Sequence, residues 1–301
     1  MAGASFGPGM RGEIAQSIQE ALLAAGFDPG RPDGQYGDRT ARALVAFLRA
    51  KRRPEAQAVD EDIWPQLMNG TPFPPLDRRA LGLTAAIEGH GYSLALGNWD
   101  QAWLTWGIIG FTLKHGEVQK IVLETERLAP DCIVEAFGML RPKLLEVMRA
   151  APAVQQRWAD EITVGHGIAE PWRIAFARLG TYPVVRDIQR QRVYQGYYLP
   201  ALALAKQLGL ESTLGIALCF DIQVQNGGLR DAARAAIEAA RARGTRGAAL
   251  REIVADAVAD AARAEYRDDV RRRKLAIATG GGAVHGLKLE LASWGLADAP
   301  I

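Results

Sequence analysis

The sequence lacks the features that mark several common protein classes. Its 301 residues include only two cysteines, Cys132 and Cys219, too few for a disulfide-rich scaffold or a four-cysteine zinc site. The net charge is +2, which is too small for a dedicated nucleic-acid-binding protein. No run of about 18 apolar residues is present, so we expect no membrane insertion. The N-terminus has no basic segment followed by an apolar one, so no classical secretory signal peptide is expected.

Motifs for cofactor or metal chemistry are absent as well. The glycines at residues 280–282 are not followed by the Lys-Ser/Thr pair of a phosphate-binding loop, and the sequence has no Gly-x-Ser-x-Gly nucleophile motif. The histidines His90, His115, His166 and His285 do not have the i, i+4 spacing of a helical zinc site. We therefore expect no cofactor and no bound metal.

The composition is otherwise that of an ordinary globular protein. Hydrophobic residues make up 49% and charged residues 23% of the chain, and the length favours two domains. Residues 69–75, Asn-Gly-Thr-Pro-Phe-Pro-Pro, have the composition of a linker. The sequence therefore predicts a small domain over residues 1–70, a Pro-rich linker over residues 71–79 and a larger domain over residues 80–301. We expect the protein to be a monomer.

Residues 1–70 have the pattern of a small helical module. Apolar residues recur at helical spacing from Ile14 to Ala25, and further helices are expected over residues 38–47 and 60–68. The first two helices are joined by a turn-rich loop that contains Asp33-Gly34-Gln35-Tyr36-Gly37. The glycines of this turn allow positive φ angles. The sequence therefore predicts three helices, the first two joined by a tight Asp-Gly turn.

This module resembles the three-helix peptidoglycan-binding domain of cell-wall hydrolases. The resemblance is carried by Ile18-Gln19-Glu20-Ala21-Leu22, Gly26-Phe27, the Asp33 to Gly37 turn, Thr40, Ala43 and Phe47, and by Ile63, Trp64 and Leu67. It implies that Asp33, Gly34, Tyr36 and Gly37 belong to a wall-binding module. Tyr36 and Trp64 would lie either in its core or against the sugar.

Residues 76–301 are predicted to be mostly helical. Stretches rich in Ala, Leu, Arg and Glu, with apolar residues at helical spacing, occur at residues 199–209, 230–243, 247–266 and 268–279. Alternation of β-branched residues is weak, although residues 103–112 fit a short hairpin. The predicted fold class is therefore mainly α with a small β element.

Two acidic residues, Glu88 and Asp100, lie on either side of a glycine-rich segment. Glu88 ends an otherwise apolar helix, and a partly desolvated carboxyl suits a general acid. Asp100 lies in a polar loop, which suits an ionised base. Glycosidases divide acid and base roles between two carboxyls in such different surroundings. From the residues alone, two solvated surface acids remain the alternative.

The segment around this pair resembles the chitosanases of glycoside hydrolase family 46. The resemblance is carried by Glu88, by Asp100 five residues before Thr105, by Thr105-x-Gly107-Ile108-Ile109-Gly110-Phe111-Thr112 and by His115-Gly116-Glu117. Those enzymes have a lysozyme-like fold, in which a two-lobed helical domain with a small β element encloses a cleft. The resemblance implies that Glu88 is the general acid, that Asp100 activates water with inversion, and that Thr105 positions that water.

The same resemblance implies supporting residues. Glu117 falls where the family has a substrate-binding acid, and Tyr92 is assigned to substrate binding as well. The segment around Asp221 is similar to an aromatic-Asp segment of the family, and Arg267 falls where the family has an arginine bonded to its catalytic acid. We therefore expect an Asp221–Arg267–Glu88 chain, in which the arginine orients the acid and Asp221 holds the arginine.

Peptidoglycan and chitosan both fit as polysaccharide substrates, because each is a β-1,4-linked polymer of glucosamine type. The module favours peptidoglycan, since tethering raises the local substrate concentration, and residues 76–301 carry 28 basic and 25 acidic groups, which suits an anionic wall. Chitosan is the alternative, supported by the catalytic resemblance and by Glu117. The short Glu88–Asp100 segment leaves an inactive wall-binding protein as a third interpretation. Each would act at the cell wall, outside the cell or in the periplasm, by an export route that the sequence does not name.

Overall fold

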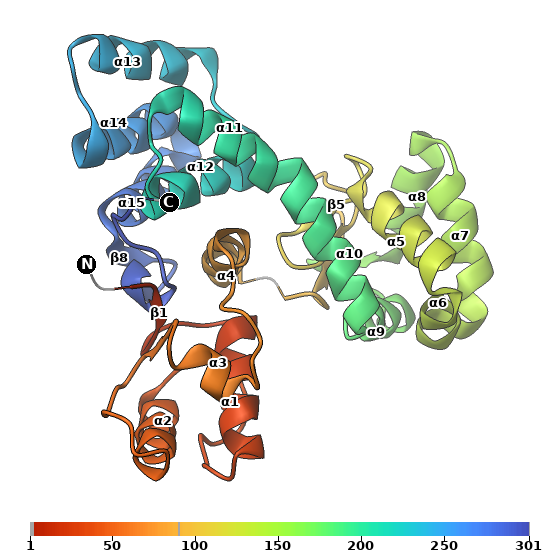
Figure 1. The fold of residues 1–301 in the computed structure, drawn as a ribbon. Coiled ribbons are helices and arrows are strands. Elements are labelled where there is room, and N and C mark those ends of the chain that lie inside the picture. The colour runs from red at the N-terminus through yellow and green to blue at the C-terminus, as the bar shows by residue number, and fades with distance from the viewer. Residues whose placement is uncertain (1–2, 90, 301) are drawn as a thin grey trace. The chain divides into compact units, whose positions relative to one another are not determined.

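The computed structural model describes residues 3–89 and 91–300, and the chain divides into two compact units (Figure 1). The first unit comprises Met1–Ile87 together with Tyr197–Ile301, and the second comprises Glu88–Gly196. The predicted fold class, mainly α with a small β element, is confirmed. Within the described part of the chain, none of the helices is both long and apolar enough to cross a membrane.

The N-terminal part of the first unit is the predicted three-helix module. Its helices are α1 (Glu13–Ala24), α2 (Asp38–Ala50) and α3 (Trp64–Leu67), and its strands β1 (Ser5–Phe6) and β2 (Val59–Asp60) pair in antiparallel orientation. The apolar face of each helix points into a shared core that includes Ile18, Leu44 and Trp64. The prediction of three helices joined by a turn-rich loop is therefore confirmed.

This module packs against the C-terminal part of the same unit. The Phe6 ring stacks on Phe73 with centroids 4.6 Å apart, and Phe6 also forms a backbone bridge with Trp294. Trp294 is 1% exposed. Phe73 lies inside the segment predicted as a linker, so part of that segment makes packed contacts. The division into residues 1–70, 71–79 and 80–301 stays a prediction.

The remainder of the first unit is built around helix α12. Its elements are α4 (Leu76–Glu88), whose last residue belongs to the second unit, α11 (Leu199–Leu208), α12 (Thr213–Asn226), α13 (Asp231–Ala242), α14 (Gly247–Asp260), a 3-10 turn (Ala264–Tyr266), α15 (Arg267–Thr279), the hairpin β8 (Gly281–Val284) and β9 (Leu287–Glu290), and a last 3-10 turn (Leu291–Ser293). Helix α12 packs against α11, α14 and α15, and its first ten residues are all buried. The helix predicted over residues 247–266 ends at Asp260.

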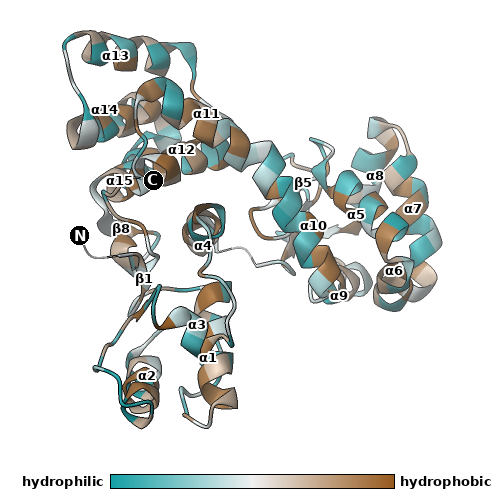
Figure 2. Cartoon of the chain, viewed as in Figure 1, coloured by the Kyte–Doolittle hydropathy of each residue, from teal (hydrophilic) through white to brown (hydrophobic). Residues whose placement is uncertain are grey.

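The second unit combines a small sheet with six helices. Strands β3 (Ala95–Leu96), β4 (Thr105–Trp106) and β5 (Phe111–Thr112) form an antiparallel sheet in that order, which confirms the hairpin predicted over residues 103–112. The other elements are α5 (Glu117–Leu128), α6 (Pro130–Phe137), a 3-10 turn (Gly138–Leu140), α7 (Arg141–Arg149), α8 (Pro152–Ile162), the strand pair β6 (Thr163–Val164) and β7 (Gly167–Ile168), α9 (Glu170–Leu179) and α10 (Pro183–Val193), followed by a π-helical turn (Tyr194–Tyr198). Hydrophobic and hydrophilic residues both occur along α5 and α10 (Figure 2), as expected of helices with one buried face.

Aromatic side chains form the core of the second unit. Trp158 meets Trp172 edge to face at 5.0 Å, Phe137 meets Phe176 at the same distance, and Trp106 of β4 lies 5.4 Å from Phe176. The Trp106 indole also donates a hydrogen bond to the Phe176 carbonyl (3.2 Å). This cluster fixes the small sheet against α9 and thereby positions the loop that precedes β4.

Candidate active site

Glu88 is the last residue of α4. The apolar residues of the preceding turns, including Leu83 and Ile87, are buried, whereas Glu88 is half-buried. The carboxyl therefore lies at the border between the apolar core and solvent. The predicted placement at the end of an apolar helix is confirmed.

A buried charged cluster holds the helical turn before Glu88. Asp221, on α12, is 0% exposed. Its Oδ1 accepts a hydrogen bond from Arg273 Nη2 (2.7 Å), and its Oδ2 accepts from Arg273 Nε (2.9 Å) and Lys274 Nζ (2.6 Å). Thr84 Oγ1 donates to Asp221 Oδ1 (3.1 Å). Because Thr84 lies one turn before Glu88 on the same face of α4, the cluster fixes the turn that carries the candidate acid.

The charges in this cluster keep Asp221 ionised. Burial alone would raise the pKa of its carboxyl, but the positive charges and hydrogen bonds of Arg273 and Lys274 outweigh burial. The pKa of Asp221 is consequently well below its ordinary value. The side chain is therefore ionised at neutral pH and anchors two buried cations.

The arginine that binds Asp221 is not the one that the sequence indicated. Arg267 is the first residue of α15 and is exposed, so the prediction that it bonds Asp221 is wrong. The buried face of α15 begins at Val270, and the side chain that reaches α12 from that face is Arg273. Val270, Arg273 and Ile277 have the i, i+3, i+7 spacing of one helix face, and this apolar pattern is the signal that points to Arg273.

The β8–β9 hairpin adds a second contact at the end of α4. His285 lies in the two-residue turn of the hairpin with a φ of 49°, followed by Gly286 with a φ of 78°, which is the geometry of a type I′ turn. Its Nδ1 lies 3.3 Å from the Ile87 carbonyl, and its Nε2 lies 2.9 Å from Asp269 Oδ1. His285 thus ties α15 to the residue before Glu88.

Asp100 lies in an exposed loop that is held in place by Asn98. The Asn98 backbone N–H donates to Thr163 Oγ1 (2.9 Å), its Nδ2 donates to Asp160 Oδ1 (2.5 Å), and its Oδ1 accepts from the Trp103 N–H (2.8 Å). Asp100 Oδ1 accepts a hydrogen bond from the backbone N–H two residues on, at 3.1 Å. Sequence reasoning missed Asn98, although Asn commonly forms such loop contacts.

The backbone of this loop is strained on both sides of Ala102. Gln101 and Trp103 have φ angles of 68° and 70°, in the left-handed region that side chains other than glycine, asparagine and aspartate rarely adopt. Strained backbone that is held by its surroundings is concentrated at functional sites. The geometry therefore agrees with a functional role for Asp100, which is exposed to solvent.

Thr105 starts strand β4 and is 9% exposed. The turn after β4 is clamped by Gln189 of α10, which is fully buried. Its Oε1 accepts from the Ile108 N–H (3.0 Å), and its Nε2 donates to the Tyr92 carbonyl (3.3 Å). Gln189, which sequence reasoning also missed, therefore fixes the sheet that carries Thr105. The role of Thr105 in positioning water stays a prediction.

The carboxylate of Glu117 is bound by cations of the protein. Arg192 Nε and Nη2 donate to its two oxygens at 3.0 Å each, and Lys120 Nζ donates at 2.7 Å. The Glu117 side chain is 13% exposed. Two cations balance its charge, which weakens its attraction for a substrate ammonium group. Its assignment to substrate binding stays a prediction.

Tyr92 is 7% exposed and packs under two arginines. The guanidinium carbons of Arg186 and Arg190 lie 5.3 Å and 5.8 Å from the centre of its ring. Arg190 Nη1 also donates to the Tyr92 hydroxyl (3.3 Å). These contacts join α10 to the segment before β3. The assignment of Tyr92 to substrate binding stays a prediction, and His90 lies outside the described residues.

In the N-terminal module, the Asp-Gly turn stabilises the fold. Asp33 Oδ1 accepts from the Gln35 N–H (2.8 Å) and from Gln19 Nε2 (3.0 Å), while Gln19 Oε1 accepts from the Gly34 N–H (2.8 Å). Gly34 has a φ of 72°, which explains the glycine at this position. Gln19, buried in α1, is the residue that organises the loop.

The two aromatic residues of the module belong to its core. Tyr36 is 2% exposed and its hydroxyl donates to the Gln57 carbonyl (2.9 Å), and Trp64 is 5% exposed. Burial raises the pKa of the Tyr36 hydroxyl. Gly37 directly precedes α2. These positions support the interpretation that Tyr36 and Trp64 lie in the core. A sugar-binding surface of the module would therefore have to consist of other residues.

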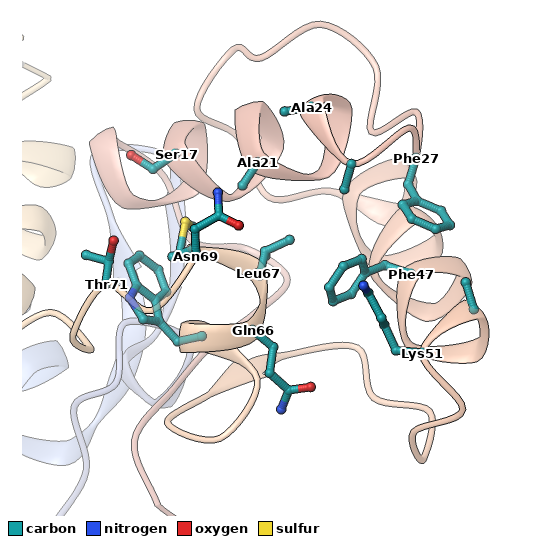
Figure 3. Close-up of a pocket in the computed structure, with 14 residues that line it drawn as sticks. Ser17, Ala21, Ala24, Phe27, Phe47, Lys51, Gln66, Leu67, Asn69 and Thr71 are labelled. Atoms are coloured by element: carbon teal, nitrogen blue, oxygen red, sulfur yellow. The ribbon is translucent and has the colours of Figure 1, made fainter.

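An open groove lies beside this core, between α1, the end of α2 and the segment around α3 (Figure 3). Its volume is about 700 Å³. Phe27 and Phe47 meet edge to face at 5.6 Å, and Lys51 Nζ lies 5.8 Å from the centre of the Phe47 ring. The groove combines an apolar floor with a polar rim that includes Ser17, Lys51, Gln66, Asn69 and Thr71. Such a combination suits a ligand with apolar and polar faces.

Comparison with known proteins gives two similarities. The family described as putative peptidoglycan binding domain matches residues 11–54. Among solved structures, the native chitosanase from Bacillus subtilis MY002 has a TM-score of 0.50 and 20% identity, covering 68% of this chain and 86% of the chitosanase. The chain has a chitosanase fold. This likeness agrees with the chitosanase fold that the sequence resemblance implies.

Two further chitosanase structures have TM-scores below that of the native enzyme. A GH46 chitosanase of Gynuella sunshinyii in complex with chitotetraose has a TM-score of 0.45 and 19% identity, covering 69% of this chain and 87% of its own. A mutant form of the Bacillus subtilis MY002 chitosanase, complexed with 6 GlcN, has a TM-score of 0.48 and 19% identity over 71% and 95% of the two chains. No curated protein sequence matches this chain.

Proposed function

We propose that the chain is a glycoside hydrolase that cleaves a β-1,4-linked amino-sugar polysaccharide by acid–base catalysis. The observation that carries the proposal is the chitosanase fold together with the contrasting positions of two carboxyls. Glu88 ends a largely buried helix, and Asp100 is exposed in a loop that Asn98 holds in place. This contrast is the one that glycosidases use to separate acid from base.

In this mechanism Glu88 donates a proton to the leaving glycosidic oxygen. Asp100 takes a proton from a water molecule that attacks the anomeric carbon from the opposite face. The product has inverted configuration if water fits between the two carboxyls, which requires a separation of roughly 6.5–9.5 Å. Thr84 and the Asp221 cluster keep the end of α4 in place, so the acid is presented by a rigid element.

For the substrate we favour peptidoglycan, with chitosan as the alternative. The support for peptidoglycan is the match of residues 11–54 to a peptidoglycan-binding domain and the groove beside its core. Binding by the module would raise the local concentration of wall glycan around the catalytic residues. Such an enzyme would act at the cell wall. The experiment below also tests the alternative that the protein binds the wall but is catalytically inactive.

The experiment measures turbidity of purified cell walls and release of reducing ends from chitosan, using the full chain. Glu88→Gln preserves shape but removes the acid, so we expect turnover on the preferred polymer to fall by about 100-fold or more. Asp100→Asn should give a comparable loss. Glu146→Gln is the matched control, because Glu146 is 63% exposed and pairs with Lys143 on the surface of the second unit. A Glu88→Gln protein with full activity would refute the assignment, and a wild-type protein that binds walls without cleaving either polymer would support the inactive alternative.

A further inference from the structure

Trp99 presents an aromatic ring to solvent directly beside Asp100. It is 54% exposed, which is unusual for the largest apolar side chain. One face of the indole is covered by the His166 ring, whose centroid lies 4.9 Å away at an interplanar angle of 17°. The stack fixes the orientation of the indole and leaves the opposite face available. Trp99 is therefore an oriented, open aromatic surface.

The two segments that form this stack are joined by hydrogen bonds. The Gly97 N–H donates to the His166 carbonyl (2.9 Å), and Asn98 binds both Thr163 and Asp160. The indole thus sits on a loop that is anchored to the end of α8 and to the β6–β7 pair. A side chain held in this way loses little conformational entropy when a ligand packs on it.

The charges around Trp99 limit the kind of ligand that fits. Residues 97–103 and 160–168, which form this part of the second unit, contain the exposed carboxyls of Asp100, Asp160 and Glu161 and no lysine or arginine. These carboxyls favour a neutral or cationic sugar ring over one that carries an acid group, so at this position a glucosamine unit fits better than an acidic unit of peptidoglycan. A pyranose ring offers apolar C–H groups on one face and hydroxyl or amino groups around its edge. Its apolar face fits the indole, and its polar edge fits the surrounding carboxyls.

We infer that the open face of Trp99 is a binding subsite for one sugar ring of the amino-sugar polysaccharide, next to the bond that Asp100 helps to cleave. The inference rests on the proposed function and adds a residue that binds substrate without taking part in proton transfer. Trp99 directly precedes Asp100, and both side chains are exposed in the same loop, so a sugar that stacks on the indole binds in the neighbourhood of the candidate base. His166 is the positioning residue of this subsite, because it supports the indole from behind.

The test measures oligosaccharide affinity separately from catalysis. The parent protein is the full chain with Glu88→Gln, titrated by calorimetry with a glucosamine hexamer in one arm and with soluble peptidoglycan glycan fragments in the other. Trp99→Ala should raise the dissociation constant for the bound glycan by about tenfold or more, whereas Trp99→Phe should retain part of the affinity. His166→Ala should give a smaller loss. Met139→Ala is the control, because Met139 is 98% exposed in the same unit and lies in a different element.

In the catalytically active protein, Trp99→Ala should raise KM and leave the pH profile of turnover unchanged, since the indole does not titrate. A Trp99→Ala protein that binds the glycan as tightly as the Met139→Ala control would overturn the subsite while leaving the proposed function intact. A parent protein that binds neither glycan would overturn both. Melting temperatures of all variants show whether a loss of affinity comes from unfolding.

Discussion

Removal of the charge at Asp221 should destabilise the first unit strongly and lower activity as well. The substitution Asp221→Asn preserves the shape of the side chain but removes the buried negative charge that Arg273 and Lys274 both bind. These two residues are 1% and 0% exposed, so water cannot replace the lost charge. Breaking a buried ion pair by removing one partner costs about 3–5 kcal/mol. For a unit of this size that corresponds to a fall in melting temperature of roughly 6–20 °C.

A surface ion pair provides the matched control. Asp256 is 53% exposed and pairs with Arg271, which also contacts Asp260. Asp256→Asn should therefore cost less than about 1 kcal/mol. A second variant separates charge from packing. Arg273→Met added to Asp221→Asn removes one of the two buried cations that bind Asp221, so it should recover part of the lost stability. Thermal and urea unfolding, followed by tryptophan fluorescence, measure these differences.

The pH dependence gives an independent check of the same cluster. Because the pKa of Asp221 is lower in the folded protein than in the unfolded chain, its stabilising contribution is fully present above about pH 4 and is lost as the pH falls further. The difference in stability between wild type and Asp221→Asn should therefore shrink in acid. If Asp221→Asn lies within about 1 kcal/mol of wild type at pH 7, as Asp256→Asn should, the cluster does not support α4 as the structure indicates.

Two further predictions concern the loop and the module. Asn98→Ala removes two side-chain hydrogen bonds and leaves the Trp103 N–H without its acceptor, so kcat should fall by about tenfold with little change in melting temperature. Full activity of Asn98→Ala would contradict a positioning role. Lys51→Glu reverses the charge at the rim of the groove and should weaken sedimentation of the full chain with insoluble peptidoglycan, while activity on soluble glycan stays unchanged. Lys143→Glu, an exposed change in the second unit, is the control, and equal binding by both variants would exclude the groove.

The module shows what sequence periodicity can and cannot predict. The helices and the Asp-Gly turn follow from local rules, namely apolar spacing and the φ angles that glycine permits. The role of each turn residue depends on long-range contacts, because Gln19 on α1 binds Gly34 and Asp33 across the loop. A glutamine within an amphipathic helix carries no local sign of that function. For the same reason, the sequence did not decide whether Tyr36 faces the core or a ligand.

The second unit shows the same limit in its helices. Between about residues 130 and 210 the sequence contains no motif that we recognise, yet α6, α8 and α10 each begin at a proline. Proline at the first helical position is a local start signal that could have placed these three helices. The aromatic cluster of Trp158, Trp172 and Phe176 depends on how the helices pack, so the sequence alone does not predict it.

The partners of Asp221 could have been predicted in part from the sequence. A carboxylate inside a helix that is apolar on every side requires cationic or hydrogen-bonding partners, so the sequence alone indicates that partners exist. Four consecutive cations, Arg271 to Lys274, lie on one later helix, and consecutive residues point in different directions. The face that carries Val270 and Ile277 must be buried, so the partners of Asp221 lie on that face. The motif position indicated Arg267, whereas helix geometry indicates Arg273 and Lys274. A buried charge without a partner is costly in free energy. Helix geometry, which shows which side chains can reach the buried carboxylate, is therefore the better guide to its partners.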